Sequence, residues 1–97
     1  MKTNIKQNKK TTPEEKIAKG LRLLIKGCLD QAQLLNLDLS LSEGRQPTVE
    51  EVARNLLIDT KSYLDKAERY SPPYIKDLNK LTTRYESIQH RFDELTT

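Results

Sequence analysis

The first long segment of the chain, residues 13–36, has its apolar residues at helical spacing. Thr12, Pro13 and Glu15 match a capping box with a proline in the first turn, which marks the start of a helix. At about 100° per residue, one face of this helix carries six small or apolar residues. They are Ile17, Leu21, Leu24, Cys28, Ala32 and Leu35. The pattern therefore predicts a helix over 13–36 with this face in the core.

The same helix has further apolar residues outside that face. Leu23 and Leu34 lie on a second side, and Leu29 lies on a third. A helix that is apolar on several sides is either central in its bundle or covered by a partner. Gly20 and Gly27 each weaken the helix by about 1 kcal/mol relative to alanine. They also mark places where another helix can approach closely.

The second segment, residues 48–70, follows a connection in which Gly44 and Pro47 turn the chain. Thr48 and Glu51 match a second capping box. If this helix is unbroken, its core face carries Val49, Ala53, Leu56, Thr60, Tyr63 and Ala67. The pattern predicts a second amphipathic helix that packs on the first.

The third segment, residues 72–96, has the most regular pattern in the chain. Pro72 and Pro73 cannot continue the preceding helix, and Ser71 has the residue type of a helix cap. The apolar positions that follow have the alternating spacing of a heptad repeat. They are Tyr74, Leu78, Leu81, Tyr85, Ile88, Phe92 and Leu95. The three segments predict an all-α fold, a small antiparallel three-helix bundle over residues 12–97.

The net charge of +3 is unevenly distributed along the chain. Residues 1–11 form a basic tail that lacks the apolar residues needed to fold, so we expect this tail to be flexible and disordered. Its four lysines are Lys2, Lys6, Lys9 and Lys10. The other 13 of the 17 basic residues stand against all 14 acidic residues, which leaves a net −1 for residues 12–97. The tail is therefore either a nucleic-acid arm or only an aid to solubility.

A second group of cations shares one side of the third helix. It comprises Lys76, Lys80, Arg84 and Arg91. Asp77 and Glu94 can partly neutralise this stripe through pairs three residues apart, in which case it is a solvated, salt-bridged face. Alternatively, the stripe contacts phosphates or an acidic partner together with the tail.

The sequence lacks the residue patterns that catalysis, cofactor binding and metal binding require. One histidine and one cysteine cannot complete a zinc site within the chain, and three scattered glycines make no phosphate-binding loop. We expect His90 to be solvated and Cys28 to be a small buried hydrophobe. The prediction is a non-enzymatic protein with no catalytic residues, no cofactor and no metal.

The sequence also indicates the cellular location of the protein. No apolar run approaches the roughly 20 residues that a membrane span needs. The first residues are positively charged but have no apolar region of a secretory signal, and a single cysteine fits a reducing compartment. We therefore expect a soluble, cytoplasmic protein that does not insert into membranes.

The stretch GRQPTVEEVARNLLID, within residues 42–64, resembles region 3 of bacterial sigma-70-type factors. The matching residues are Gly44, Arg45, Pro47, Thr48, Glu51, Val52, Ala53, Leu56 and Ile58. The resemblance implies a helix-turn-helix-like element over 48–69 that works within RNA polymerase holoenzyme. Leu57 stands where that family has its turn glycine. If the chain turns there, Ile58 folds inward, whereas in an unbroken helix Ile58 faces away from the core.

A second resemblance concerns layout alone. The last two predicted helices are similar to the hairpin of the bacteriocin immunity proteins of lactic acid bacteria, which are small, basic helical bundles. Those bundles usually have four helices, whereas three are predicted here. This resemblance implies protection of the producing cell through a protein partner at the membrane.

Two functional hypotheses follow. The first is a small regulatory protein of bacterial or phage type that docks on a protein partner as an inhibitor, adaptor or immunity protein. Its predicted partner contacts are Leu23, Leu34 and Ile58. Self-association through the first or third helix would cover such side chains equally well. The second hypothesis is a regulator associated with nucleic acid or RNA polymerase, which uses the basic tail, the cationic stripe and the 48–69 element.

Overall fold

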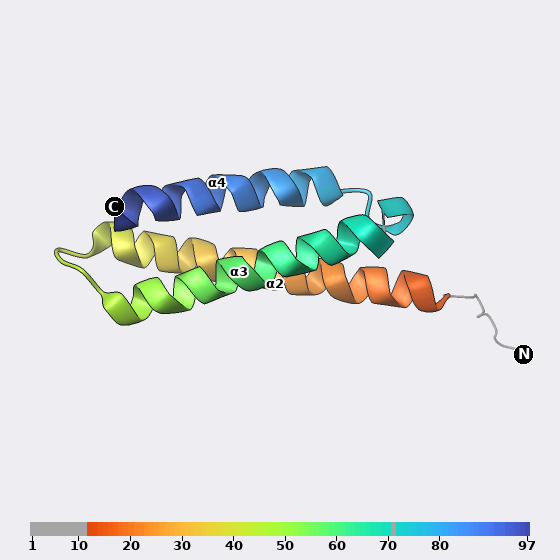
Figure 1. Ribbon diagram of the computed structural model, residues 1–97, viewed down its shortest axis with the longest axis horizontal. Helices are drawn as coiled ribbons and strands as arrows, with labels where there is room; N and C mark the ends of the chain where they lie inside the picture. The colour runs from red at the N-terminus through yellow and green to blue at the C-terminus, as the bar shows by residue number, and fades with distance from the viewer. Residues whose placement is uncertain (1–11, 71) are drawn as a thin grey trace, which may run out of the picture.

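Three long α-helices lie side by side in the computed structural model, which describes residues 12–70 and 72–97 (Figure 1). They are α2 (Pro13–Leu41), α3 (Pro47–Tyr70) and α4 (Leu78–Thr96), and the short 3₁₀ helix η1 (Pro72–Tyr74) precedes α4. α3 runs antiparallel to α2, and α4 returns in the direction of α2. Each long helix contacts the other two. The predicted all-α three-helix fold is confirmed.

α2 begins as predicted but ends later. Glu15 N–H donates to Thr12 Oγ1 at 3.2 Å, and Thr12 N–H donates to Glu15 Oε1 at 3.4 Å, so the capping box is formed. The predicted end at residue 36 is wrong, because α2 continues to Leu41. Leu39 is half-buried against the core, so packing continues beyond the predicted end.

The face of α2 that lies in the core differs from the predicted face. The buried residues are Ala18, Leu21, Ile25, Leu29, Ala32 and Asn36. Leu29, which the pattern placed on a third side, is fully buried, whereas Ile17 and Leu24 are 56% and 48% exposed. The expectation for Cys28 is also wrong, because its side chain is only half-buried. The predicted and the observed faces share Leu21 and Ala32, and the observed face is rotated toward Ala18, Ile25 and Leu29.

α3 is a single unbroken helix. Its buried apolar residues are Ala53, Leu57, Leu64 and Ala67, with Thr60 among them. The predicted core residues that are only half-buried are Val49, Leu56 and Tyr63. Leu57 is 1% exposed, while Ile58 is 60% exposed. Of the two alternatives for this segment, the unbroken helix is confirmed, and the turn that the sigma-factor resemblance implies near Leu57 is not formed, because a buried leucine continues the helix there.

The start of α3 lies one residue earlier than predicted. Glu50 N–H donates to the carbonyl of Gln46 at 2.9 Å, so Thr48 lies inside the helix and does not cap it. The carboxylate of Glu50, a residue only 4% exposed, accepts two hydrogen bonds from the Arg45 guanidinium. A carboxylate in the first turn also interacts favourably with the helix dipole. This pair, which the pattern did not predict, stabilises the beginning of α3.

α4 starts later than predicted. η1 occupies residues 72–74, and α4 begins at Leu78, so the predicted start at residue 72 is wrong. Ser71, the expected cap, lies outside the described residues. Tyr74 is 45% exposed, and Ile75 is buried instead. The rest of the predicted seam is confirmed as buried or half-buried: Leu78, Leu81, Tyr85, Ile88, Phe92 and Leu95.

Arg22 and Asp77 join α2 to the start of α4. Arg22 Nε donates to Asp77 Oδ1 at 3.0 Å, and Arg22 Nη2 donates to Asp77 Oδ2 at 2.8 Å. The hydrogen bond from Arg22 holds the pKa of the Asp77 carboxyl below its ordinary value, and the same bond raises the pKa of the Arg22 guanidinium. Asp77 is the N-cap residue of α4, yet its side chain makes no capping bond, since it is directed to Arg22.

We expect Asp77→Asn to destabilise the protein at neutral pH and to have a smaller effect in acid. Because the folded-state pKa is lowered, the stabilisation is fully present above the ordinary value of 3.8 and is lost as the pH falls through the folded-state pKa. The measurement is the difference in free energy of unfolding between wild type and variant, from urea titrations at neutral pH and below about pH 4. A difference independent of pH would show that the charge of Asp77 has no part in stability.

Candidate docking face on α2

The exposed large apolar side chains of the described residues are concentrated on one helix. Six of the nine lie on α2, with exposed fractions of 48–75%. These six residues, called the outer face below, are Ile17, Leu23, Leu24, Leu34, Leu37 and Leu41. The opposite side of the helix, with Ile25 and Leu29 at 0%, packs in the core. Single exposed leucines are ordinary, but a row along one helix indicates a contact surface.

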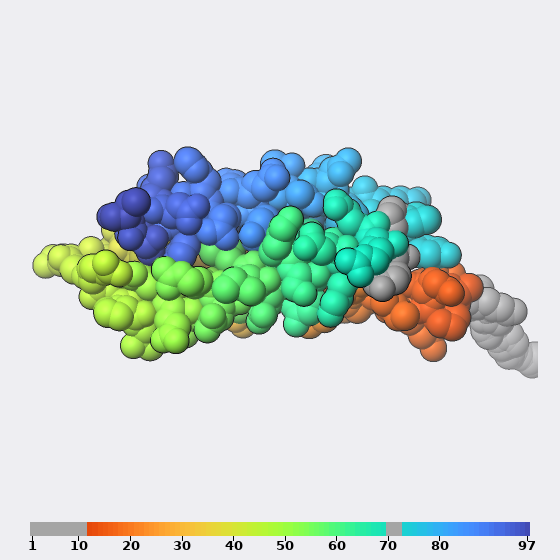
Figure 2. Space-filling model, in the orientation of Figure 1, coloured from red at the N-terminus to blue at the C-terminus, as the bar shows by residue number. Residues whose placement is uncertain are grey.

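The outer face has a heptad pattern of its own. Ile17, Gly20, Leu24, Gly27, Gln31, Leu34, Asp38 and Leu41 follow one another at alternating steps of three and four residues. This is the spacing of a coiled-coil seam. In the view of Figure 2, α3 and α4 cover most of α2, whose two ends emerge beside them. α2 therefore carries two seams, and α3 and α4 occupy only the other one.

A shallow hollow marks the middle of the outer face. It has a volume of about 400 Å³ and is lined by Gly20, Leu23, Leu24, Gly27, Cys28 and Gln31. A Cβ atom added at Gly20 or Gly27 would meet nothing within 4 Å. The expected close approach at these glycines is therefore not made by another helix of the described chain. The glycines leave the outer face indented where larger residues would fill it.

We expect Gly27→Ala to raise the free energy of unfolding by about 1 kcal/mol, because alanine has the higher helix propensity and restricts the unfolded chain. Within one chain no clash opposes this gain, since the added methyl group enters open space. Thermal and urea unfolding, followed by circular dichroism, would measure the change. A loss of stability would show that Gly27 makes a close contact in the folded protein.

Charge is divided between the two halves of α2. The basic residues of the helix all lie in its first half and are Lys16, Lys19, Arg22 and Lys26. Beyond Lys26 the charged residues of the helix are Asp30 and Asp38, and Glu43 follows in the loop. Glu14 and Glu15 in the first turn partly offset these cations, and Arg22 already pairs with Asp77, so the first half of α2 is weakly basic and the second half is acidic.

The predicted partner contacts divide between two helices. Leu23 and Leu34 are 62% and 66% exposed and both belong to the outer face. Ile58 is equally exposed but lies on α3. The sequence pattern assigned Ile17 and Leu24 to the core and so missed them as surface residues. The heptad they share with Leu34 was the signal that could have identified them.

The predicted cationic stripe is partly engaged within the bundle. Arg84 Nη2 donates to Asp30 Oδ1 and to Gln33 Oε1, both at 2.7 Å. Arg91 donates to Ser40 Oγ at 3.4 Å and to Glu94 Oε1 at 3.5 Å. These two arginines therefore tie α4 to α2. Of the other members, Lys76 is exposed in the turn before α4 and Lys80 is exposed on it, while Lys2, Lys6, Lys9 and Lys10 lie outside the described residues.

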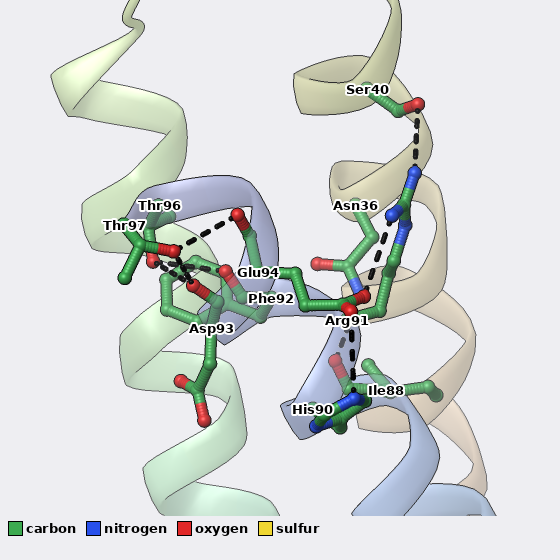
Figure 3. Close-up of polar contacts among 10 residues, drawn as sticks. All are labelled: Asn36, Ser40, Ile88, His90, Arg91, Phe92, Asp93, Glu94, Thr96 and Thr97. Carbon is green, nitrogen blue, oxygen red and sulfur yellow. Dashed lines mark hydrogen bonds and ion pairs between the residues drawn. The ribbon is translucent and has the colours of Figure 1, made fainter.

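The stripe borders a groove between α2 and α4, with a volume of about 690 Å³. Asn36 lies at this junction and is 6% exposed. Its Nδ2 donates to the Ile88 carbonyl at 3.0 Å, whereas its buried Oδ1 has no partner among the described residues. Figure 3 shows the amide nitrogen directed toward Ile88 and the oxygen directed away from it. The hydrogen bond between Asn36 and Ile88 is thus a buried polar contact between α2 and α4 at the lining of the groove.

The histidine of the chain, His90, is exposed on α4. The His90 side chain is 77% exposed, as expected, and its Nε2 lies 3.6 Å from Glu94 Oε2. Residues 12–70 and 72–97 contain no group of three or more histidine, cysteine, aspartate or glutamate side chains that could hold a metal ion. Within the same residues, each helix is too short or too polar to cross a membrane.

Comparison with known proteins leaves the chain without an assigned relative. No protein-family model, no curated protein and no solved structure matches it.

Proposed function

We propose that this chain is a non-enzymatic binding protein that docks on another protein chain through the outer face of α2. The observation that supports the proposal is the row of six exposed apolar side chains on one helix. Removal of apolar surface from water is the main favourable contribution to most protein–protein association. A helix face with this periodicity is suited to a groove or to another helix. The inhibitor, adaptor and immunity roles are all forms of this activity.

The regulator hypothesis has less support. Arg84 and Arg91 already bond to α2 residues, and α3 lacks the turn of a DNA-reading element. The other nucleic-acid contacts that the regulator hypothesis predicts are Lys76, Lys80 and the lysines of residues 1–11. A fluorescence-polarisation titration with mixed-sequence duplex DNA at about 50 and 200 mM salt separates the hypotheses. Affinity that falls by decades with salt would favour the regulator, because apolar docking has no such dependence.

Photo-crosslinking in cells that express the protein tests the docking function. A benzophenone amino acid replaces Leu34 or Leu23 on the outer face, and His90, exposed on α4, provides the control position. We expect adducts from both leucine positions and few from position 90, with the adduct mass identifying the bound chain. Equal or absent adducts at all three positions would contradict docking through α2.

A further inference from the structure

We propose that the partner of the outer face is a second copy of this chain, bound antiparallel so that two α2 helices pair along their outer seams. This inference rests on the proposed function and names the occupant of the same face. The basis is self-complementarity: a two-fold interface requires that one patch fits itself, in both shape and charge. The outer face meets this requirement in the antiparallel direction only.

The shape of the seam supports an axis of symmetry at the level of Leu29. Antiparallel pairing about this level places Leu24 opposite Leu34 of the second copy and Ile17 opposite Leu41 of the second copy. It places Gly27 opposite Gln31 of the second copy, so the open space at the glycine receives a long side chain. It places Gly20 opposite Asp38 of the second copy, near Lys16 and Lys19. Large apolar residues thus meet at two levels, and Gln31 enters the space at Gly27.

The same pairing brings opposite charges together. Lys16 of one copy lies at the level of Ser42 of the second copy, between its Asp38 and its Glu43, while Glu15 lies at the level of the same Glu43. One helical turn is about 5.4 Å, so the lysine side chain reaches either carboxylate. Asp30 lies near the axis in both copies, but Arg84 of the same chain already pairs with it at 2.7 Å. The repulsion expected between the two Asp30 carboxylates near the axis is therefore reduced.

A parallel pair lacks these features. Each residue would then face its own counterpart, so that glycine meets glycine and the two hollows remain empty. Asp38 would lie against Asp38 of the second copy, and the basic ends of both helices would be adjacent. Like charges at this distance destabilise an interface, which disfavours the parallel arrangement.

Sedimentation velocity across a dilution series tests the dimer. The wild type is expected to reach a mass of twice the 11.2 kDa of one chain. The double variant Leu24→Glu/Leu34→Glu is expected to remain at the mass of one chain at the highest concentration. Ile58→Glu is the matched control, because Ile58 is 60% exposed on α3, and it is expected to dimerise like the wild type. Circular dichroism verifies that all variants stay folded, since the substituted side chains are exposed.

Cysteine cross-linking tests the orientation. Ile17→Cys and Leu41→Cys are made separately in a Cys28→Ser background and are oxidised alone and mixed. The antiparallel pair gives a disulfide-linked dimer only in the mixture, whereas a parallel pair would give one from each variant alone. A parallel result, or a wild type that stays monomeric at every concentration, would overturn the inference. In that case photo-crosslinked adducts to a different protein would still support docking through α2, and absent adducts would refute that function as well.

Discussion

Leu57→Gly is expected to destabilise the protein severely, with a loss of about 3–6 kcal/mol in the free energy of unfolding. Removing a buried leucine side chain to the β-carbon costs about 2–5 kcal/mol, and glycine in place of alanine within a helix costs about 1 more. Leu57 is 1% exposed in the middle of α3, so both costs apply in full. Small domains are stable by only about 5–15 kcal/mol, and a loss of this size leaves little margin.

Ile58→Gly provides the matched control for this prediction. Ile58 is the next residue of the same helix but is 60% exposed, so its substitution is expected to cost mainly the helix propensity, about 1 kcal/mol. Urea titrations followed by circular dichroism would measure both changes. The comparison also tests the resemblance to sigma-70-type factors, which have a turn glycine where this chain has Leu57. Glycine at position 57 that left stability unchanged or raised it would contradict the continuous helix.

The helices were predictable wherever only one face of the segment is apolar. In α4 the apolar positions from Leu78 to Leu95 form one seam, so spacing alone identified the packing side correctly. In α2, by contrast, two apolar faces compete, and periodicity cannot rank them. Which face is buried depends on how closely α3 and α4 approach, which is a property of the whole bundle. This is why Ile17 and Leu24 were placed in the core although both are exposed.

The outer face of α2 was predictable in part for the same reason. Leu23 and Leu34 were expected at the surface because they lie outside the predicted core face, and they are exposed. The extent of the face was not predicted, since α2 was expected to end before Leu37 and Leu41. Those two leucines alternate with polar residues, a pattern that also fits a short extended connection. Only the structure shows that they continue the helix.

Asn36 is the one polar residue in the buried seam of α2. Its hydrogen bond to the Ile88 carbonyl, at 3.0 Å, links α2 to α4 at a single level. A polar residue in an apolar seam commonly fixes the register of helices at a cost in stability. The unpartnered Oδ1 is that cost here, because a buried acceptor without a donor loses its hydration.

Asn36→Asp is therefore expected to destabilise the protein by about 3–5 kcal/mol at neutral pH, the cost of an uncompensated buried charge. The carboxylate would replace the Nδ2 donor with an oxygen beside the Ile88 carbonyl, and among the described residues Asn36 Oδ1 has no partner, although Arg91 lines the same groove. Burial raises the folded-state pKa of such a carboxyl, so the penalty grows as the pH rises above the ordinary aspartate value and is small in acid. Urea titrations at neutral and acid pH would show this dependence.

Asn36→Leu separates the effect of charge from the effect of losing the hydrogen bond. This variant removes the unpartnered Oδ1, and the Ile88 carbonyl keeps its helical hydrogen bond as an interior residue of α4. Stability is therefore expected to stay level or rise by about 1 kcal/mol, opposite in sign to the aspartate variant. If both variants lost stability equally, the hydrogen bond itself would be the main contribution of Asn36. If only the aspartate variant lost stability, Asn36 would serve to set the level at which α4 packs on α2, and its value to the fold would lie in register and not in strength.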